Sequence, residues 1–394
     1  MPPAKRPGRP SKPAPATKRS ANRPAAAAAA AGKTPRSPRA KSAGAPKPAP
    51  RRRAGGKATG LSVAVTGPTG EIGQAFIRAL ERTPQVTEIV GMARSPFDPS
   101  DHGWKKTSYR QGDVLDRASV DALVAGFDVV VHLAFLIMGS LEESTRVNLE
   151  GSRNVFEGAV AANAKRLVYT SSVAAYGFHK DNPRPLHEDD PTRGSAEHYY
   201  SAQKAEVEQV LTDALSGGKT GAYVFRPCIV AGPDAPLLID NLPYTQLSER
   251  LPAGVLRLLE GVPILKPVLP DPGVPFQLVH HDDVARALCA AVLGKGEPGV
   301  YNLAGEGEIT MSQLADELGW YSIPIPELAL GATAEIVSRL SFLPAEAQWV
   351  NAFREPVLMD TSKARKLLGW RPQHAALDTL RAMISAHRGG ALVR

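Results

Sequence analysis

Three glycines at a fixed spacing, placed directly after a short apolar run, constrain the fold of this chain more than any other feature. Residues 61–65 predict a buried strand and residues 74–82 a helix. Between them, Gly67 permits a tight turn, Gly70 lets a pyrophosphate approach the backbone, and Gly73 lets helix and strand pack closely. The segment predicts a dinucleotide site, because the N–H groups of a helix N-terminus bind phosphates. The other loop residues predicted to contact the cofactor are Thr69, Glu71 and Ile72.

The residue that follows the second predicted strand bears on the choice between NAD and NADP. Residues 88–92 are predicted to form this strand, and Arg94 comes soon after it, with no acidic residue before Asp98. Sites selective for NAD place an acid about 20 residues beyond the glycines, on the ribose 2′-hydroxyl, whereas an arginine suits the 2′-phosphate. Arg94 therefore favours NADP. The alternative is a solvated loop arginine near the adenine of either cofactor.

Two later strand ends offer further cofactor contacts. A third predicted strand precedes Asp113, whose carboxylate can accept from an adenine amino group, while Asp116 is predicted to cap the helix that starts at Arg117. Residues 127–134 read as a buried parallel strand, and the carboxyl ends of such strands bind ligands in open α/β sheets. The residues predicted to contact the cofactor here are Asp113, Val114, Leu133 and Ala134.

Strand and helix patterns continue to alternate, with a helix over residues 142–162 and a strand over 166–170. This alternation predicts an α/β fold, a Rossmann-type doubly wound parallel sheet. We expect one domain over residues 61–394, whose smaller, C-terminal substrate-binding part lies mainly in residues 234–278 and 306–394.

A serine, a tyrosine and a lysine form the catalytic pattern. Ser172 closely follows the strand 166–170, and Tyr200 and Lys204 lie in a predicted helix. Their spacing of four residues places the phenol and the ammonium on one helical face, where the positive charge can lower a tyrosine pKa that is about 10 in water. Tyr199 lies off that face, so Tyr200 is the predicted catalytic residue.

These patterns occur with several others in a fixed order. They are Gly67-x-x-Gly70-x-x-Gly73, His132-Leu-Ala134, Thr170-Ser-Ser-Val-Ala-Ala-Tyr-Gly177, Tyr200-x-x-x-Lys204, Arg226-Pro227, Gly232-Pro233, Val279-His-His-Asp-Asp-Val-Ala285 and Tyr301-Asn-Leu-Ala-Gly305. The set resembles the extended short-chain dehydrogenase/reductases, the NAD(P)-dependent epimerase/dehydratase family. The resemblance covers nearly all of residues 61–380.

The resemblance implies an enzyme and assigns roles to matching residues. Tyr200 would be the general acid/base for a substrate hydroxyl or carbonyl, and Lys204 would lower its pKa and hold the nicotinamide ribose. Ser172 would bind the substrate oxygen, with its neighbour Ser171 as the less favoured choice. Pro227 joins the residues expected to contact NAD or NADP. A homodimer is also expected from the resemblance alone.

One departure narrows the reaction. The family's sugar 4,6-dehydratases typically carry an acidic pair next to the active-site Ser or Thr, but Val173 and Ala174 follow Ser172 here. Dehydration is therefore disfavoured, which leaves epimerisation of a sugar nucleotide or oxidoreduction of a ketone or alcohol. The rival from another class is a non-catalytic cofactor sensor or nucleic-acid-associated protein. The complete Ser172, Tyr200 and Lys204 set argues against this rival.

The expected substrate segment is rich in apolar residues. Residues 234–278 contain Arg250, Arg257 and Lys266 among many apolar side chains, and residues 135–138 are apolar too. One interpretation is an apolar substrate such as a terpenoid, a steroid-like molecule or an aromatic ketone or alcohol. The favoured alternative is packing of a lid or a dimer surface.

Two groups of reactive residues are interpreted as structural. Residues 280–283, His-His-Asp-Asp, could suggest a metal site, but they fit better as a strand end with an Asp N-cap before a helix over 284–293, so no metal is expected. Cys228 and Cys289 have apolar neighbours, which predicts buried thiols. Near the end of the chain, Thr361 or Ser362 is expected to cap a helix that stops at Gly369.

The first 60 residues differ from the rest in charge. They hold 16 Lys and Arg, 12 Pro and no acidic residue, whereas the remaining residues hold 31 basic and 39 acidic side chains. We expect this tail to be disordered, because it has too little apolar surface to offset its ordering entropy. Three roles remain open for the tail. It could bind a polyanion such as nucleic acid, it could be an organelle-targeting peptide, or it could simply keep the protein soluble.

The acidic body excludes a uniformly basic nucleic-acid-binding domain. The longest apolar runs are far shorter than the roughly 18 residues of a membrane span, so no membrane contact is expected. Two cysteines cannot build a disulfide framework, and the expected location is the cytoplasm, with organelle targeting by the basic tail left open.

Overall fold

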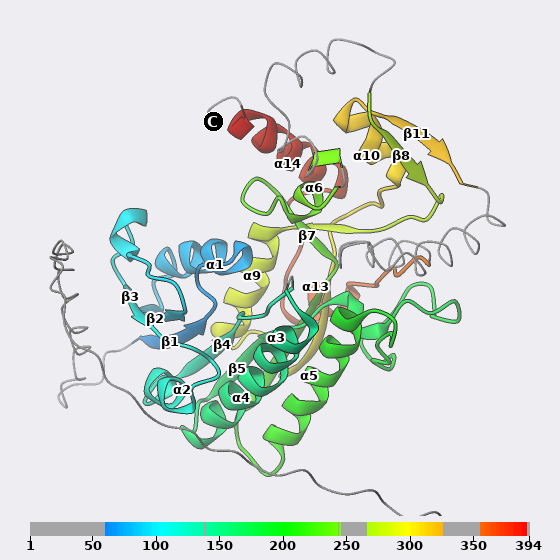
Figure 1. Ribbon diagram of the computed structural model, residues 1–394. Coiled ribbons are helices and arrows are strands. Elements are labelled where there is room, and N and C mark those ends of the chain that lie inside the picture. The colour runs from blue at the N-terminus through cyan, green and yellow to red at the C-terminus, as the bar shows by residue number, and fades with distance from the viewer. Residues whose placement is uncertain (1–59, 138, 243, 246–265, 326–354, 392–394) are drawn as a thin grey trace, which may run out of the picture. The chain divides into compact units, whose positions relative to one another are not determined.

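A computed structural model describes residues 60–137, 139–242, 244–245, 266–325 and 355–391, and the statements below concern these residues (Figure 1). The basic tail before residue 60, Met138, Arg250, Arg257 and parts of the expected substrate segments lie outside the described residues. Among the described residues, no helix combines the length and hydropathy needed to cross a bilayer.

Seven parallel strands form the central sheet, in the order β10-β6-β5-β4-β1-β2-β3 (Figure 1). The order reverses beside β1, which leads to β2 on one side and has β4 on the other. This confirms the predicted doubly wound sheet and puts its switch point at β1 and β4, where such sheets bind ligands. The strands are β1 Leu61–Thr66, β2 Val86–Ala93, β3 Thr107–Gln111, β4 Val129–His132, β5 Arg166–Thr170, β6 Gly221–Pro227 and β10 Gly299–Leu303.

Helices cover both faces of the sheet. Helices α1 and α9 pack together on one face, and α2, α4 and α5 pack on the other. The bounds are α1 Glu71–Glu81, α2 Arg117–Val124, α3 Leu141–Thr145, α4 Ser152–Ala161, α5 Tyr199–Leu215 and α9 His281–Val292. Shorter turns are the 3-10 helices η1 Pro99–His102 and η3 Val173–Tyr176 and the π-helical turn η2 Arg146–Gly151.

The strands are apolar on both sides because each face meets a helical layer. In β1, Val63 and Val65 join the core under α1 and α9, while Ala64 joins the core under α2, α4 and α5. In β5, Val168 takes the first side and Leu167 the second. The twofold alternation of a strand thus supplies two cores from one apolar run.

A smaller C-terminal part has its own core, built from residues such as Ile239, Leu278, Leu314 and Leu380. It contains two two-stranded sheets and three helices, among the described residues. The strands are β7 Ile229–Ala231 with β9 Leu278–His280, and β8 Val268–Asp271 with β11 Tyr321–Pro324. The helices are α6 Leu237–Asp240, α10 Met311–Leu318 and α14 Ala376–Ala391. Helix α13, Ser362–Leu367, packs instead against β10 of the central sheet, and its Ala364 joins the core under α1 and α9.

Local signals placed some helix starts and missed others. Asp116 caps α2 as predicted, its side chain accepting a hydrogen bond from the Ala118 N–H. The expected Asp cap before residue 284 is wrong: α9 begins at His281, and His280 is its N-cap. The helix predicted over 142–162 is present as α3, η2 and α4, which run on without a break.

Candidate active site

The outer two glycines of the cofactor loop are enclosed by backbone. Gly67 has a φ of +72°, and a Cβ there would lie 2.7 Å from the Ala134 N atom. A Cβ on Gly73 would lie 2.2 Å from the Gly67 carbonyl oxygen. A side chain at either position would therefore push the end of β4 or the first turn of α1 away from the loop.

Gly70 has different surroundings and faces outward. It is exposed, and the nearest heavy atom to a Cβ there would be the Gly67 carbonyl oxygen, 3.8 Å away. Gly70 is also the N-cap of α1, and it offers the first turn no side-chain cap. The N–H groups of Glu71 and Ile72 thus open the helix beside free space, which fits the pyrophosphate of a dinucleotide. The Gln74 side chain holds the turn by donating to the Thr69 carbonyl oxygen at 3.0 Å.

Other predicted cofactor residues lie along the carboxyl edge of the sheet. Leu133 and Ala134 follow β4 directly against Gly67. Arg94 follows β2, and its guanidinium lies 3.4 Å from the Glu143 carboxylate, with both side chains about half exposed. Such an exposed ion pair contributes little, so the guanidinium can exchange this partner for another anion.

The third strand and β6 supply the remaining predicted contacts. Asp113 accepts a hydrogen bond from the Leu115 N–H at 3.0 Å, so its carboxylate already shapes the turn after β3. Val114 is buried against Gly151. Pro227 is buried at the end of β6, two strands away from β4.

Tyr200 and Lys204 project from the first turns of α5 toward the end of β5. The Lys204 Nζ donates to the Thr170 carbonyl oxygen at 3.0 Å, and it lies 5.8 Å from the centre of the Tyr200 ring. The Phe135 ring covers the same ammonium, with its centroid 3.6 Å from Nζ, and meets the Tyr200 ring edge-on at 5.5 Å. The structure therefore brings the two predicted catalytic residues together under an aromatic side chain.

Ser172 completes this group. Burial raises the pKa of Tyr200 to about 12, and a hydrogen bond with the Ser172 side chain acts in the opposite direction. Burial also lowers the pKa of Lys204 to about 7, against a contribution from Glu208 that raises it. Desolvation by burial is thus the largest cause of the pKa shift of both Tyr200 and Lys204. Tyr200 therefore carries its proton at neutral pH, as an acid must before it donates.

The two neighbouring alternatives have other partners. The Ser171 hydroxyl donates to the Glu208 carboxylate at 2.6 Å, and the Tyr199 hydroxyl donates to the Ile137 carbonyl oxygen at 2.7 Å. Both hydroxyls thus donate to acceptors within the protein.

His132 is a buried structural residue. Its Nδ1 lies 2.7 Å from the Thr66 hydroxyl and its Nε2 lies 2.9 Å from the Ser152 hydroxyl. Burial, reinforced by the charge of Lys204, lowers the His132 pKa to about 3, so the ring stays neutral. The ring thus joins β1, β4 and α4 beneath the site.

Asn148 and Gln203, which sequence reasoning missed, anchor the loop that carries Phe135. The Asn148 amide accepts from the Leu136 N–H at 2.8 Å and donates to the Leu136 carbonyl oxygen at 2.9 Å. It also donates to the Gln203 side chain on α5 at 2.8 Å. Asn148 lies in the π-helical turn η2, and π turns are frequent at functional sites.

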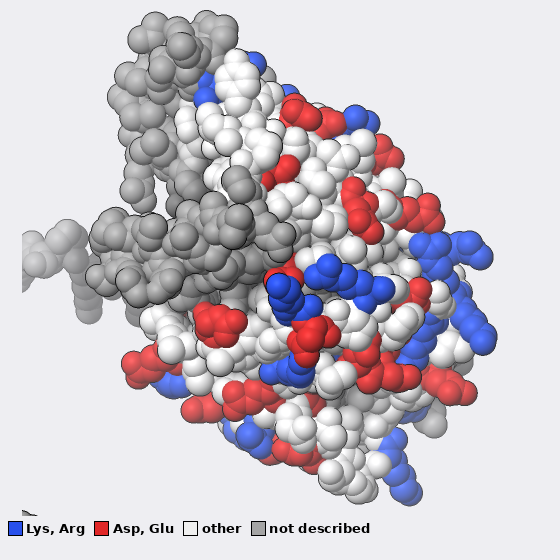
Figure 2. Space-filling view, turned by 90° about the vertical axis from the view of Figure 1, so that its right-hand side faces the viewer, with Lys and Arg blue, Asp and Glu red and all other residues white. Residues whose placement is uncertain are grey.

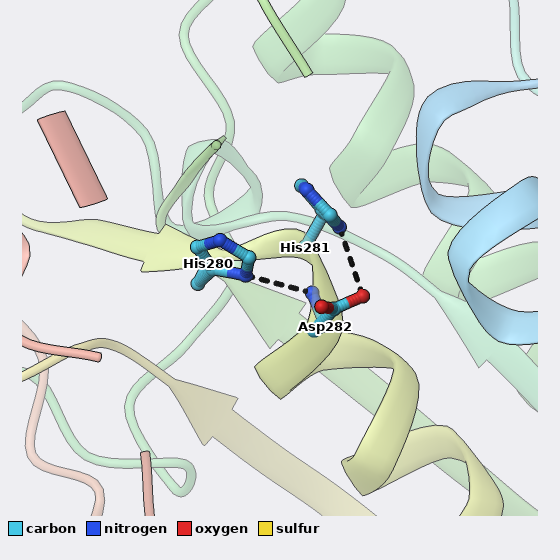
Figure 3. A group of neighbouring side chains, drawn as sticks. All are labelled: His280, His281 and Asp282. Carbon is cyan, nitrogen blue, oxygen red and sulfur yellow. Dashed lines mark hydrogen bonds and ion pairs between the residues drawn. The ribbon is translucent and has the colours of Figure 1, made fainter. Parts of the chain in front are cut away.

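His280, His281 and Asp282 are the residues whose spacing could suggest a metal site (Figure 3). Their candidate ligand atoms lie within 4.8 Å of one another. The His280 Nδ1 accepts from the Asp282 N–H at 3.2 Å, which is the α9 cap. The His281 Nε2 accepts from the Asp234 N–H, and its Nδ1 lies 3.2 Å from the Asp282 carboxylate. These atoms therefore hold the start of α9 and the loop beside it.

Cys228 and Cys289 are buried and free, as predicted, and burial raises the pKa of both thiols.

Near the chain end, Thr361 is the N-cap of α13 by position, but Asp360 supplies the capping carboxylate, which accepts from the Ser362 N–H at 2.8 Å. Lys266 lies near the exposed ring of Tyr321 on β11.

Comparison with known proteins gives a family match over more than half of the chain. The model of the NAD dependent epimerase/dehydratase family matches residues 63–304. A structure of the Bordetella bronchiseptica enzyme WbmH in complex with NAD+ has a TM-score of 0.61 and 22% sequence identity, and covers 83% of this chain and 98% of that chain. This likeness concerns the fold.

Two curated relatives are similar over shorter stretches. The N-acetyl-alpha-D-glucosaminyl-diphospho-ditrans,octacis-undecaprenol 4-epimerase of Escherichia coli O157:H7 is 33% identical over 126 residues, 31% of this chain and 37% of that protein. The 3 beta-hydroxysteroid dehydrogenase type 7 of Rattus norvegicus is 31% identical over 184 residues, 41% of this chain and 52% of that protein. The similarity therefore spans about half or less of each relative.

Proposed function

The chain belongs to the NAD-dependent epimerase/dehydratase family, and we propose that it is an oxidoreductase for a hydroxyl or carbonyl group of a small substrate. The family is defined by its nicotinamide cofactor, and the cofactor loop of this chain fits a dinucleotide. The proposed catalytic residues are Ser172, Tyr200 and Lys204. The proposed cofactor contacts are the loop residues 67–73, Arg94, Asp113, Val114, Leu133, Ala134, Lys204 and Pro227.

One observation carries this proposal: the side chains of Tyr200 and Lys204 lie together at the end of β5, the strand that Ser172 closely follows. Gly67 of that loop contacts Leu133 and Ala134, and the next residue, Phe135, packs against both Tyr200 and Lys204. A substrate oxygen between Ser172 and Tyr200 would therefore lie beside the strand end that the cofactor loop touches.

The roles follow from the chemistry of each group. Bound NAD(P) supplies or accepts the hydride. In reduction, Tyr200 donates its proton to the carbonyl oxygen that becomes the alcohol, and in oxidation it takes that proton back. Ser172 holds the same oxygen by a hydrogen bond. The Lys204 ammonium stabilises the phenolate that forms when Tyr200 has given up its proton.

The side chains around the site favour redox chemistry on an apolar molecule. Phe135 forms an aromatic wall over Lys204, and Val173 offers no acid or base for the elimination of water. Similarity to a 3 beta-hydroxysteroid dehydrogenase supports a hydroxyl on an apolar skeleton. A sugar-nucleotide epimerase is the second candidate, and the similarity to a 4-epimerase favours it.

The cofactor phosphate preference is a separate proposal. Arg94 follows β2, and its guanidinium pairs with the exposed Glu143 carboxylate. We propose that this guanidinium binds the 2′-phosphate of NADP. Dissociation constants for NAD and NADP, measured on one preparation, test this. Tighter NADP binding supports it, and tighter NAD binding contradicts it.

A hydride-label experiment separates the two enzyme candidates. The protein is incubated with nicotinamide cofactor deuterated at C4 and with a ketone or a UDP-sugar. A reductase consumes reduced cofactor and releases a deuterated alcohol in equal amounts. An epimerase interconverts sugar nucleotides with no net consumption of added cofactor and retains NAD through purification. Failure to do either with any substrate, despite bound cofactor, would contradict the proposed function.

A further inference from the structure

A third polar residue continues the Tyr200–Lys204 face of α5 by one turn. Glu208 follows Lys204 by four residues, so its side chain projects from the same face. It is buried and forms a bidentate ion pair with buried Arg226 of β6: Nη2 donates to Oε2 at 2.6 Å and Nε to Oε1 at 3.0 Å. This pair ties the helix of the proposed catalytic residues to a strand of the central sheet.

The same carboxylate holds the residue before Ser172. The Ser171 hydroxyl donates to Glu208 Oε1 at 2.6 Å, and the Ser171 N–H donates to the Phe225 carbonyl oxygen at 2.7 Å. Ser171 is therefore fixed to both α5 and β6. Because Ser172 comes next in the chain, the position of its hydroxyl depends on this attachment.

Arg226 reaches the other end of the turn that Ser172 begins. Ser172 is the N-cap of η3, and Tyr176 is the last residue of η3. The Arg226 guanidinium lies over the Tyr176 ring, with Cζ 4.6 Å from the centroid, and the Tyr176 hydroxyl donates to Asn302 Oδ1 at 2.8 Å. The ion pair thus supports both ends of the turn.

The need to hold α5 against β6 does not by itself explain why Glu208 and Arg226 are charged and buried. Taking an ion pair out of water costs free energy that its mutual attraction often fails to recover, and apolar side chains of similar volume commonly hold two elements together as well. A carboxylate does supply two things that apolar residues lack: an acceptor for the Ser171 hydroxyl, and a negative charge one helical turn from the Lys204 side chain.

Among the described residues, the other groups around Lys204 carry no negative charge that could offset its burial. The Lys204 Nζ lies 3.5 Å from the Tyr169 hydroxyl oxygen on β5. The His132 ring on β4 is neutral, and Tyr200 lies on the same helix as Lys204. Glu208 is the carboxylate that raises the Lys204 pKa, against the larger effect of burial.

We propose that Glu208 and Arg226 form a positioning pair for the active site, in which Glu208 places a negative charge one helical turn from Lys204 and, through Ser171, holds Ser172 beside Tyr200. The proposal rests on the function proposed above. Glu208 acts through its neighbours Ser171 and Lys204, and Arg226 fixes the carboxylate in place.

A double substitution tests the charge while it keeps the polar contacts. Glu208→Gln with Arg226→Gln removes both buried charges together, and a glutamine oxygen can still accept from Ser171. Glu206→Gln is the matched control, because it removes one negative charge from the exposed side of α5. The measurement is the NMR titration of Lys204 in [6-13C]lysine-labelled, cofactor-free protein, with Lys204→Arg used to assign the signal.

The expected result is a Lys204 titration midpoint lower by about one pH unit in the double variant and unchanged in Glu206→Gln. An unchanged midpoint in the folded double variant would overturn the proposal. This titration needs no turnover, so it gives its answer even where the proposed reaction fails.

A second variant tests the positioning of Ser172 and keeps the ion pair intact. Ser171→Ala should lower kcat about tenfold with a substrate that passes the label experiment, while the dissociation constant of the cofactor and the Lys204 midpoint stay at wild-type values. A wild-type kcat in Ser171→Ala would overturn the positioning role, also where the double variant does not fold.

Discussion

Gly70 and Gly73 differ in what a methyl group would meet, and this gives a paired prediction. A Cβ on Gly70 has its nearest neighbour at 3.8 Å, whereas one on Gly73 lies 2.2 Å from a backbone oxygen. Gly70→Ala should therefore fold with a Tm close to wild type but bind NAD(P) at least about tenfold more weakly, because the methyl group occupies the phosphate site. Gly73→Ala should lower the Tm.

Thermal unfolding and a fluorescence titration with NADH and NADPH measure both effects. Wild-type cofactor affinity in a folded Gly70→Ala protein would show that the phosphates bind elsewhere.

Glu71 makes stability depend on pH near neutrality. Burial raises its pKa from 4.5 to about 7; the nearby Asp240 adds to this, while a hydrogen bond from the Leu237 backbone and the charge of His281 oppose it. A carboxyl group with a raised folded-state pKa stabilises the fold below pH 4.5, and this contribution is lost as pH rises through about 7. The wild-type protein should therefore be less stable at pH 8 than at pH 5 by this contribution.

Glu71→Gln removes that dependence. Relative to wild type it should gain roughly 1–2 kcal/mol at pH 8, a figure reduced from the full shift because the side chain is partly exposed, and gain little at pH 5. Urea unfolding at the two pH values measures the difference, with Glu206→Gln as an exposed control. An equal effect of Glu71→Gln at both pH values would argue against a buried, titrating carboxyl group.

At the scale of single elements, the loop after β4 depends on one amide. Asn148 is fully buried and satisfies both polar groups of Leu136. Asn148→Ala should destabilise the protein by about 1–3 kcal/mol, because it leaves the partly buried N–H and carbonyl oxygen of Leu136 without these partners. Asn154→Ala, which removes bonds to the carbonyl oxygens of Val114 and Leu115, should cost less.

Urea unfolding of the two variants provides the comparison. Equal losses in Asn148→Ala and Asn154→Ala would contradict the idea that Asn148 anchors the loop beneath Phe135.

Helices and strands were predictable from the sequence where residues a few positions apart determine them. The strand 166–170 was predicted with its observed bounds, and Asp116 was predicted as a cap, because apolar runs and capping residues act over a few positions. The start of α9 was missed, since a histidine at the N-cap competes with two aspartates that follow it. The η2 turn has no sequence signature of this kind.

The candidate site was predictable in part for the same reason. The glycine spacing and the four-residue step from Tyr200 to Lys204 are local patterns. The contacts of Asn148 with Gln203 and of Glu208 with Arg226 join residues that are 55 and 18 positions apart, on different elements. Such pairings follow from the packing of α5 against its neighbours, and a single sequence does not encode them at a fixed spacing.

At the scale of the whole chain, charge is divided between two parts. On the face shown in Figure 2, acidic and basic side chains are interspersed and neither sign covers the surface. The excess of Lys and Arg lies in residues 1–60, which hold 16 of the 47. We propose that any polyanion contact belongs to this segment.

Deletion of residues 2–59 tests that proposal. The full-length protein should bind a DNA duplex with an affinity that falls steeply between 50 and 200 mM salt, as about ten phosphate contacts would require, and the shortened protein should lose this binding. Turnover should be unchanged. Equal DNA binding by both proteins would place the contact in the acidic body instead.

The most direct test of the proposed chemistry is the rate of hydride transfer in Tyr200→Phe, measured beside its affinity for NAD(P). The substitution removes one hydroxyl and leaves the ring that packs against Phe135. If Tyr200 is the acid/base, the rate with an alcohol or ketone that the wild-type protein turns over should fall by about 10²–10⁴-fold, with the cofactor dissociation constant within twofold of wild type. A Tyr200→Phe protein that transfers hydride at the wild-type rate would contradict the Ser172–Tyr200–Lys204 site.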